Sequence, residues 1–337
     1  MRALGGIAFV FFALAWSALV IFSDTKIAPN TIKQIRSQNY TAIDGRVVES
    51  RVISNPGKKG SLIYGALIDY QYEVGPVVYG ATRLRYDALA SSDKRRADEI
   101  VRKYPEGPVR VFYNPQRAGD AVLERGVGGE TLMLILILTP FHLLMIGSWA
   151  ASLTWLRYKR RSPVAGGASI SRLAAGTRIR LSKITSPETA GLALLGLSFG
   201  AIFIVGLTTN FHPPLQTISA AWITILVGAI GFGAQRWLKI HSGDEDMIID
   251  ERARTVSLPP TFGRKNRVTI NISNIQAVAV EKLGHSTGKG RTTYSYAPAL
   301  RLKKQSGIDT TLVDWLDEPR AAAFATWLRQ QLGLPPA

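Results

Sequence analysis

A glycine-rich stretch, GHSTGKGR at residues 284–291, is the segment whose residue types most invite a chemical role. Glycines allow backbone N–H groups to approach a phosphate, and Lys289 could neutralise its charge. The spacing differs from that of a phosphate-binding loop, because Gly290 stands where such a loop has Ser or Thr. We expect a hairpin loop, with a weak anion-binding loop as the alternative. The candidate binding surface comprises Lys282, His285, Lys289 and Arg291.

Residues that could bind a metal or exchange protons are scattered along the chain. No HxxxH or HExxH pattern places two ligands on one helical face, and the chain has no cysteine to act as ligand or nucleophile. Asp44 with Glu49, and Asp314 with Asp317, could pair as acid and base, but the predicted strands and caps usually carry such carboxylates as solvated charges. The sequence predicts no catalytic pair, no metal site and no cofactor.

His142 is an ionisable residue inside an apolar segment, 131–156. An ionisable side chain at bilayer depth is a functional candidate by default. Apart from Arg236 at the end of the last one, the apolar segments contain no Asp, Glu, Lys or Arg that could accompany it. A packed or hydrogen-bonded neutral histidine is therefore favoured over a proton-transfer or metal-binding role.

Four apolar segments must position these residues. A run of ~20 apolar residues crosses a bilayer core, so we expect four transmembrane helices in two hairpins. The first could instead be a cleaved signal peptide, but its length favours an uncleaved anchor. Small residues at GxxxG spacing, Gly196 with Gly200 and Ala229 with Gly233, predict close packing of the last two helices. The segments are 3–22, 131–156, 189–209 and 217–237.

A basic connector, residues 157–188, separates the two hairpins. It contains eight Lys or Arg residues, whereas the loop NFHPPLQ between the last two segments contains none. Lys and Arg beside spanning segments remain on the cytoplasmic side, so we expect the connector inside the cell. The apolar residues Ile179, Leu181 and Ile184 are expected to contact the membrane. The predicted contacts to anionic lipid are Arg157, Lys159, Arg160, Arg161, Arg178, Arg180 and Lys183.

Residues 24–129 have the pattern of a small, mainly-β domain with one helix. In ALIDYQYEV apolar and polar residues alternate, which is typical of a half-buried strand. Ala97, Ile100, Val101 and Tyr104 recur at helical spacing. We expect this domain outside the cytoplasm.

The segments GRVVESRV, VVYGA and YPEGPVRVFYNPQRAGDAVLERG occur here in that order. In this order, flanked by spanning segments, residues 3–150 resemble the bacterial membrane proteins grouped as domain of unknown function 3592. The resemblance implies topology and fold, and no activity. This chain has Arg117 and Ala118 where such proteins usually have a second proline after the turn. The motif residues, to which we assign structural roles, are Gly45, Tyr113, Asn114, Pro115 and Leu123.

The last region, 244–334, combines six or seven predicted strands with one C-terminal helix, in which Pro319 lies in the first turn and Gly333 ends the helix. This pattern resembles bacterial pleckstrin-homology-like domains, which implies a barrel closed by the helix. We expect this domain to be cytoplasmic.

The combined expectation is a membrane α-helical protein with two small mainly-β domains, located as a multi-pass protein in a bacterial inner membrane. A non-enzymatic, membrane-anchored interaction or sensor protein is favoured, with a membrane enzyme or an accessory subunit of an envelope enzyme or transport complex as the alternative. A transporter is disfavoured because the four segments lack charge apart from Arg236 at the end of the last one. The expected partners are anionic lipid headgroups and an unidentified protein. The net charge of +17 is not gathered with aromatic residues as in a nucleic-acid binder.

Overall fold

The computed structural model describes residues 2–56, 62–86, 94–160, 167–174, 176–181, 184–260, 264–287, 291–303, 310–315 and 317–335. The chain forms two compact units. The N-terminal unit comprises Ile7–Gly147 and Leu195–Ile225, and the C-terminal unit comprises Met1–Gly6, Ser148–Leu194 and Leu226–Ala337.

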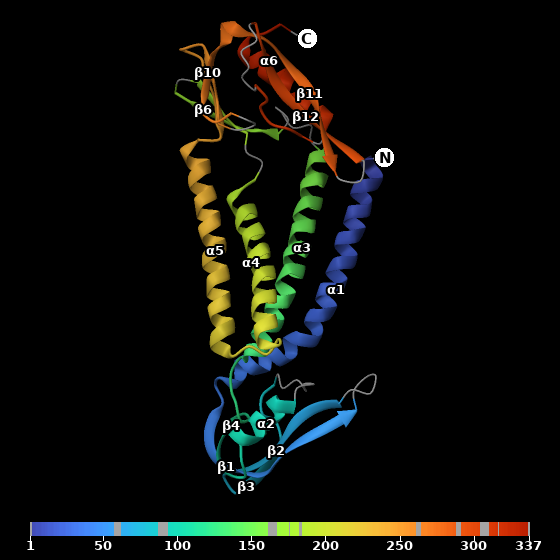
Figure 1. The fold of residues 1–337 in the computed structure, drawn as a ribbon, viewed down its shortest axis with the longest axis vertical. Coiled ribbons are helices and arrows are strands. Elements are labelled where there is room, and N and C mark those ends of the chain that lie inside the picture. The colour runs from blue at the N-terminus through green and yellow to red at the C-terminus, as the bar shows by residue number, and fades with distance from the viewer. Residues whose placement is uncertain are drawn as a thin grey trace. The chain divides into compact units, whose positions relative to one another are not determined.

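Within the described residues, four helices are long and apolar enough to cross a membrane, as the sequence predicts, and this supports membrane association. α1 continues past Phe22, the expected end of the first apolar segment, to Ser37. Gln34 holds this extension against the start of α3, since its Nε2 donates to the Thr131 hydroxyl at 2.8 Å and its Oε1 accepts from the Gly128 N–H at 3.2 Å. The helices are α1 (Arg2–Ser37), α3 (Gly129–Arg160), α4 (Ser186–Thr209) and α5 (Leu215–Ser242) (Figure 1).

Among the described residues, a five-stranded antiparallel sheet with one helix makes up the part of the N-terminal unit outside its long helices, as the alternating pattern predicts. The strand order is β3-β2-β1-β4-β5, and α2 (Lys94–Lys103) packs on β1 and β2. Val47, Ile68, Tyr70 and Val111 form the centre of its apolar core. The strands are β1 (Thr41–Pro56), β2 (Leu62–Val74), β3 (Val77–Ala81), β4 (Gly107–Asn114) and β5 (Arg117–Val122).

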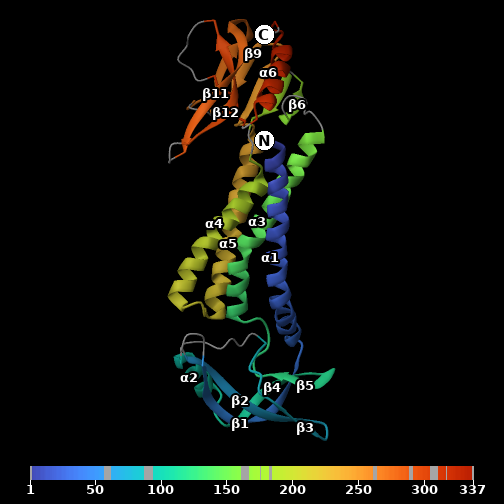
Figure 2. The same cartoon turned by 90° about the vertical axis from the view of Figure 1, so that its right-hand side faces the viewer.

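The C-terminal unit contains two sheets and a helix that share one hydrophobic core. The first sheet has the order β10-β9-β8-β7-β6, and the second is the hairpin β11–β12. α6 (Glu318–Leu332) lies beside that hairpin (Figures 1 and 2) and buries Phe324 and Leu328. The strands are β6 (Ser169–Leu173), β7 (Gly176–Arg180), β8 (Asp246–Asp250), β9 (Thr255–Leu258), β10 (Val268–Asn271), β11 (Ile275–Thr287) and β12 (Arg291–Leu302).

The C-terminal helix agrees with its sequence signals, whereas the predicted closed barrel does not form. Gly333 ends α6 in the left-handed conformation with φ 65°, and a proline occupies its first turn. Among the described residues the two sheets remain separate ladders. Isolated bridges of Tyr296 with Trp315 and of Ala299 with Thr311 extend the smaller sheet.

Part of the basic connector is a β-hairpin, which sequence inspection did not predict. β6 and β7 pair with each other, and β7 pairs with β8. Ile179 and Leu181 are buried in the C-terminal core, 0% and 5% exposed, so the expectation that they contact the membrane is wrong. Period-2 alternation from Thr177 to Leu181 places these side chains on the core face.

The predicted close packing of the last two helices is supported at Gly233 and not at the Gly196–Gly200 pair. A Cβ at Gly233 would lie 3.0 Å from Ala190 Cβ, so α5 and α4 approach closely there. A Cβ at Gly196 or Gly200 would meet no described atom within 4 Å, so this GxxxG is not buried in the helix pair. Spacing alone does not reveal which face of α4 meets α5.

Gly45 is required by packing between the strands of the N-terminal sheet. A Cβ there would lie 2.6 Å from the Gln71 carbonyl oxygen and 2.7 Å from Val111 Cγ2. We predict that Gly45→Ala destabilises the protein by about 1–3 kcal/mol through overpacking. The measurement is the midpoint of thermal unfolding. Gly80→Ala is the control, because a Cβ at Gly80 meets nothing within 4 Å. Equal melting temperatures for the two variants would contradict this role.

Candidate functional site

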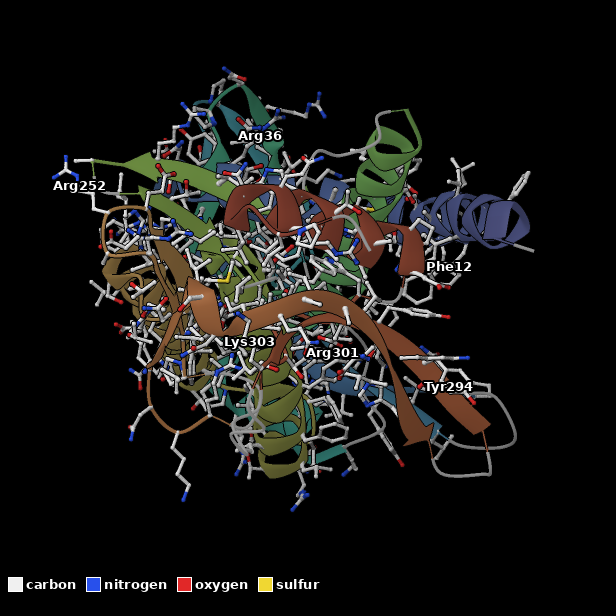
Figure 3. All side chains as sticks on the ribbon, turned by 90° about the horizontal axis from the view of Figure 1, so that it is seen from above. Phe12, Arg36, Arg252, Tyr294, Arg301 and Lys303 are labelled. Atoms are coloured by element: carbon white, nitrogen blue, oxygen red, sulfur yellow. The ribbon has the colours of Figure 1, made fainter. Side chains whose placement is uncertain are left out.

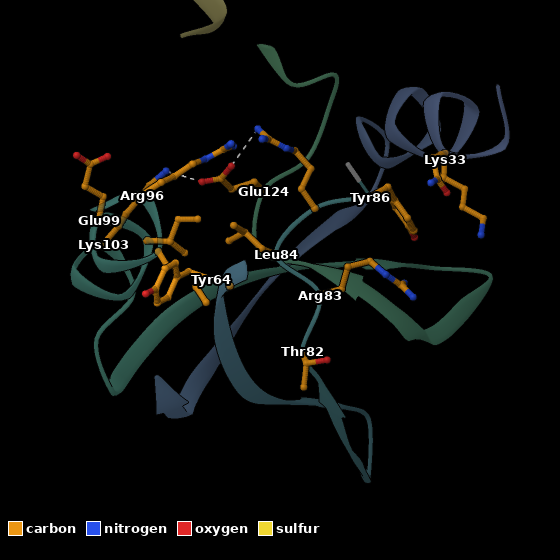
Figure 4. A pocket seen from close by; sticks show the side chains of 16 residues that line it. Lys33, Tyr64, Thr82, Arg83, Leu84, Tyr86, Arg96, Glu99, Lys103 and Glu124 are labelled. Carbon is orange, nitrogen blue, oxygen red and sulfur yellow. Dashed lines mark hydrogen bonds and ion pairs between the residues drawn. The ribbon is translucent and has the colours of Figure 1, made fainter. Parts of the chain in front are cut away.

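An open pocket of about 700 Å³ lies in the N-terminal unit, lined by α1, α2, β2 and the segment after β3 (Figure 4). We call it the basic pocket, because five basic side chains line it against two carboxylates, Glu99 and Glu124. A cavity of this size is within the range of small-molecule sites. The basic residues are Lys33, Arg83, Arg85, Arg96 and Lys103.

Helix α2 supplies one wall of the basic pocket because it is amphipathic. Ala97 is 4% exposed, and Ile100 packs against the core of the sheet. Arg96, Glu99 and Lys103 follow the i, i+3, i+7 spacing of one helical face and line the pocket. The apolar periodicity that anchors α2 on the sheet therefore also orients its charged residues.

Glu124 is the carboxylate on which the pocket's cations converge. It accepts a hydrogen bond from Lys103 Nζ at 2.5 Å and one from the Tyr104 hydroxyl at 2.9 Å, and Arg85 NH1 lies 3.2 Å from its other oxygen. Burial raises the pKa of Glu124, but these hydrogen bonds and the charges of Lys103 and Arg85 outweigh burial and lower it overall. Glu124 is therefore an anion that offsets part of the positive charge in the pocket.

Arg96 connects the basic pocket to the ends of the apolar helices. It forms an ion pair with Glu130 in the first turn of α3, and its NH1 lies 2.5 Å from His212 Nδ1 in the α4–α5 turn. Glu130 is 7% exposed. A Cβ at Gly129 would lie 2.2 Å from the Pro213 carbonyl oxygen, so the turn and α3 are in close contact. The basic pocket thus lies level with these helix ends.

A second polar cluster borders the pocket and is structural. Asp120 accepts hydrogen bonds from the Tyr86 hydroxyl at 2.7 Å, the Tyr40 hydroxyl at 3.0 Å and Arg83 NH1 at 2.8 Å. Burial, together with the hydrogen bond and charge of Asp120, raises the pKa of both tyrosines. Both hydroxyls stay protonated as donors, so this cluster fixes the end of α1 to β5. Lys33 Nζ lies over the Tyr86 ring, 5.8 Å from its centroid.

The motif residues of the N-terminal domain have structural surroundings. Asn114 Oδ1 accepts a hydrogen bond from the Gln116 N–H at 3.0 Å, which forms the Asx-turn before β5, with Pro115 inside the turn. The Tyr113 ring stacks on Tyr72 with centroids 6.4 Å apart. Leu123 is 4% exposed in the core.

The predicted lipid contacts of the connector do not share one environment. Arg178 forms an ion pair with Asp246 and donates to the Ile240 carbonyl at 3.3 Å, whereas Arg180 is exposed on β7. α3 includes Arg157, Lys159 and Arg160, whose side chains lie outside the described part of the structure. Arg161 and Lys183 lie outside the described residues.

The predicted binding loop of the C-terminal unit is the end of the β11–β12 hairpin. Lys282 Nζ lies over the Tyr294 ring, 4.0 Å from its centroid, and His285 Nε2 is 2.8 Å from the Ser295 hydroxyl. Figure 3 shows Tyr294 at one end of this unit, away from Arg252. Lys289 lies outside the described residues, and Arg291 is described only as the first residue of β12.

His142 has a charged partner, contrary to the sequence prediction. Its Nε2 lies 3.0 Å from Asp24 Oδ2, and its Nδ1 lies 2.9 Å from the Leu138 carbonyl oxygen. The partner was missed because Asp24 follows the first apolar run in sequence, and only the continuation of α1 brings it beside α3. The ring is hydrogen-bonded to both helices. No group of three or more potential metal ligands occurs among the residues searched, which are the described ones.

Residues 43–128 match the model of a family described as Domain of unknown function (DUF3592). This range contains all of the sheet except the first two residues of β1, together with α2 and most of the basic pocket, so the resemblance read from the sequence is confirmed for this domain. No curated protein and no solved structure matches the chain.

The residues that build the basic pocket were not predicted as a site. Arg85 and Glu124 lie in segments without regular strand or helix periodicity, so their convergence depends on the sheet topology. The charged spacing of Arg96, Glu99 and Lys103 was readable on α2. It resembled an ordinary solvated helix face.

We predict that Glu124→Gln lowers the free energy of unfolding at pH 7 by about 1 kcal/mol, because it removes the ion pairs of Glu124. The effect is small because water reaches Lys103, one of the partners. The folded pKa of Glu124 is lowered, so its stabilisation is present above the ordinary value of 4.5 and is lost as pH falls through the folded pKa. The difference in melting temperature between wild type and variant should shrink below pH 4.5. Glu73→Gln, at an exposed position of β2, is the control. A difference that is constant with pH would contradict the assignment.

Proposed function

We propose that this protein is a non-enzymatic, membrane-anchored interaction or sensor protein of a bacterial envelope, and that its N-terminal β-domain binds an anionic ligand in the basic pocket. The supporting observation is the pocket itself, which five cations and two carboxylates line and in which Arg85 and Lys103 contact Glu124. Its walls combine the domain with α1, so a bound ligand would contact both.

Electrostatics favours binding over catalysis in this pocket. Glu124 in the pocket and Glu130 beside it are each paired with a cation. The lowered pKa of Glu124 makes it a poor general acid at neutral pH. Its role in the proposal is to hold Lys103 and Arg85 in place until a ligand anion arrives.

A membrane enzyme, or an accessory subunit of an envelope enzyme or transport complex, is the second candidate function. The observation that favours it is the convergence of Arg96, Glu130 and His212 at the helix ends. A smaller pocket of about 300 Å³ lies there, lined in part by Arg95 and Asn210. Such a site could orient an anionic substrate, with His212 as the proton-transfer group.

Anion binding can be tested with the full-length protein in detergent, using inorganic pyrophosphate as the probe. A ligand that binds only the folded state raises the melting temperature, so pyrophosphate should raise it more than sodium chloride at equal ionic strength. The pocket variant Lys33→Gln/Lys103→Gln should lose this excess. Arg46→Gln/Arg117→Gln removes the same charge from exposed strand positions outside the pocket and should keep it. An excess of the same size in both double variants would refute binding in the pocket.

The proposed topology places the N-terminal β-domain outside the cytoplasm and the connector and C-terminal unit inside. The natural chain has no cysteine, so single cysteines can report exposure directly. A membrane-impermeant maleimide added to intact cells should label a cysteine at Gln116 and leave one at Ser171 unlabelled until the membrane is permeabilised. Both positions are exposed. Labelling of both in intact cells would rule out this arrangement.

A further inference from the structure

We infer that the anion taken by the basic pocket is the phosphate of an anionic phospholipid, whose headgroup enters from the surrounding bilayer. This inference rests on the proposed function and names the ligand class. Three observations support it: the level of the pocket, the residues that α1 contributes, and the exposure of its two lysines.

The pocket lies beside the ends of the apolar helices, which is where a membrane surface would lie. Arg96, in the pocket wall, contacts the first turn of α3 and the α4–α5 turn, where three apolar helices begin or end. These helices are candidate membrane spans. A bilayer places its phosphates just outside the ends of such spans, in a headgroup layer roughly 5–8 Å thick on each side.

Helix α1 contributes pocket residues directly from the membrane side. Asn30 and Lys33 line the pocket and lie on the same helix as the apolar run that ends at Phe22. Lys33 is exposed, and a lysine at a span's end directs its ammonium group toward headgroups while its stem stays in apolar surroundings. A lipid beside α1 would therefore have Lys33 next to its phosphate.

The pocket can accept a phosphate without first losing its internal ion pairs. The Lys103 side chain is 61% exposed although it donates to Glu124. An ammonium group has three donors, so Lys103 can contact a second acceptor. Tyr64 and Leu84 add apolar surface to the lining, which suits the first methylenes of a lipid's acyl chains. The volume of about 700 Å³ admits a headgroup.

The experiment is native mass spectrometry of the full-length protein in detergent, titrated with phosphatidylglycerol or with phosphatidylcholine. Wild type should retain one phosphatidylglycerol more tightly than phosphatidylcholine. Lys33→Gln/Lys103→Gln should lower the affinity for phosphatidylglycerol by about 30-fold, since each basic residue near a membrane surface contributes about fivefold to affinity. Arg46→Gln/Arg117→Gln should bind like wild type, and unliganded melting temperatures show whether each variant is folded.

A separate arm distinguishes lipid from soluble phosphate. Glycerol 3-phosphate carries the same anionic group without acyl chains, and it should displace the lipid only at concentrations far above the lipid's own. Equal phosphatidylglycerol affinity in the two double variants would overturn the inference, as would displacement by glycerol 3-phosphate at concentrations similar to the lipid's. If the lipid test fails but pyrophosphate still stabilises wild type and not the pocket variant, the proposed function stands and only the lipid inference falls. If pyrophosphate also fails to distinguish the two proteins, the proposed function and the inference both fall.

Discussion

The buried carboxylate of Glu130 is the constraint on which the N-terminal unit depends. A carboxylate that is 7% exposed at a helix end requires a cation, and Arg96 of α2 provides it. Among the described residues, Glu130 Oε2 has no hydrogen-bond partner, so this side chain relies on the contacts of its other oxygen. The ion pair therefore holds α2, and the sheet on which α2 packs, against the helix ends.

The basic pocket follows from this attachment. Once α2 is fixed at α3, its Lys103 faces Glu124, and the continuation of α1 places Lys33 on the opposite rim (Figure 4). The contacts that position these elements, apolar packing and the Arg96–Glu130 ion pair, lie outside the centre of the pocket. Basic side chains from α1, α2 and the segment after β3 are therefore brought together there. A membrane surface is the environment in which such an excess is stabilising, because headgroup phosphates neutralise it.

Local patterns in the sequence predicted the elements, and long-range contacts determined the parts that were missed. Apolar runs predicted four long helices, alternation predicted the N-terminal sheet, and Gly333 marked the end of α6. Charge density made the connector look like a surface loop, but Ile179 and Leu181 alternate with charged residues at the end of β7, which pairs with β6. The pocket and the Asp24–His142 contact join residues far apart in sequence, and no single-segment pattern encodes such pairs.

Photo-crosslinking at Tyr64 in bilayers tests most directly whether a lipid headgroup occupies the basic pocket. A photoreactive phenylalanine analogue at this position, in full-length protein within bilayers containing anionic phospholipid, would report what lies within a few ångströms of the lining. The predicted adduct is an anionic phospholipid, identified by its mass, with the same analogue at Gln116 in the β4–β5 turn giving none. The absence of a lipid adduct at Tyr64, or equal lipid adducts at both positions, would contradict a headgroup site in the pocket.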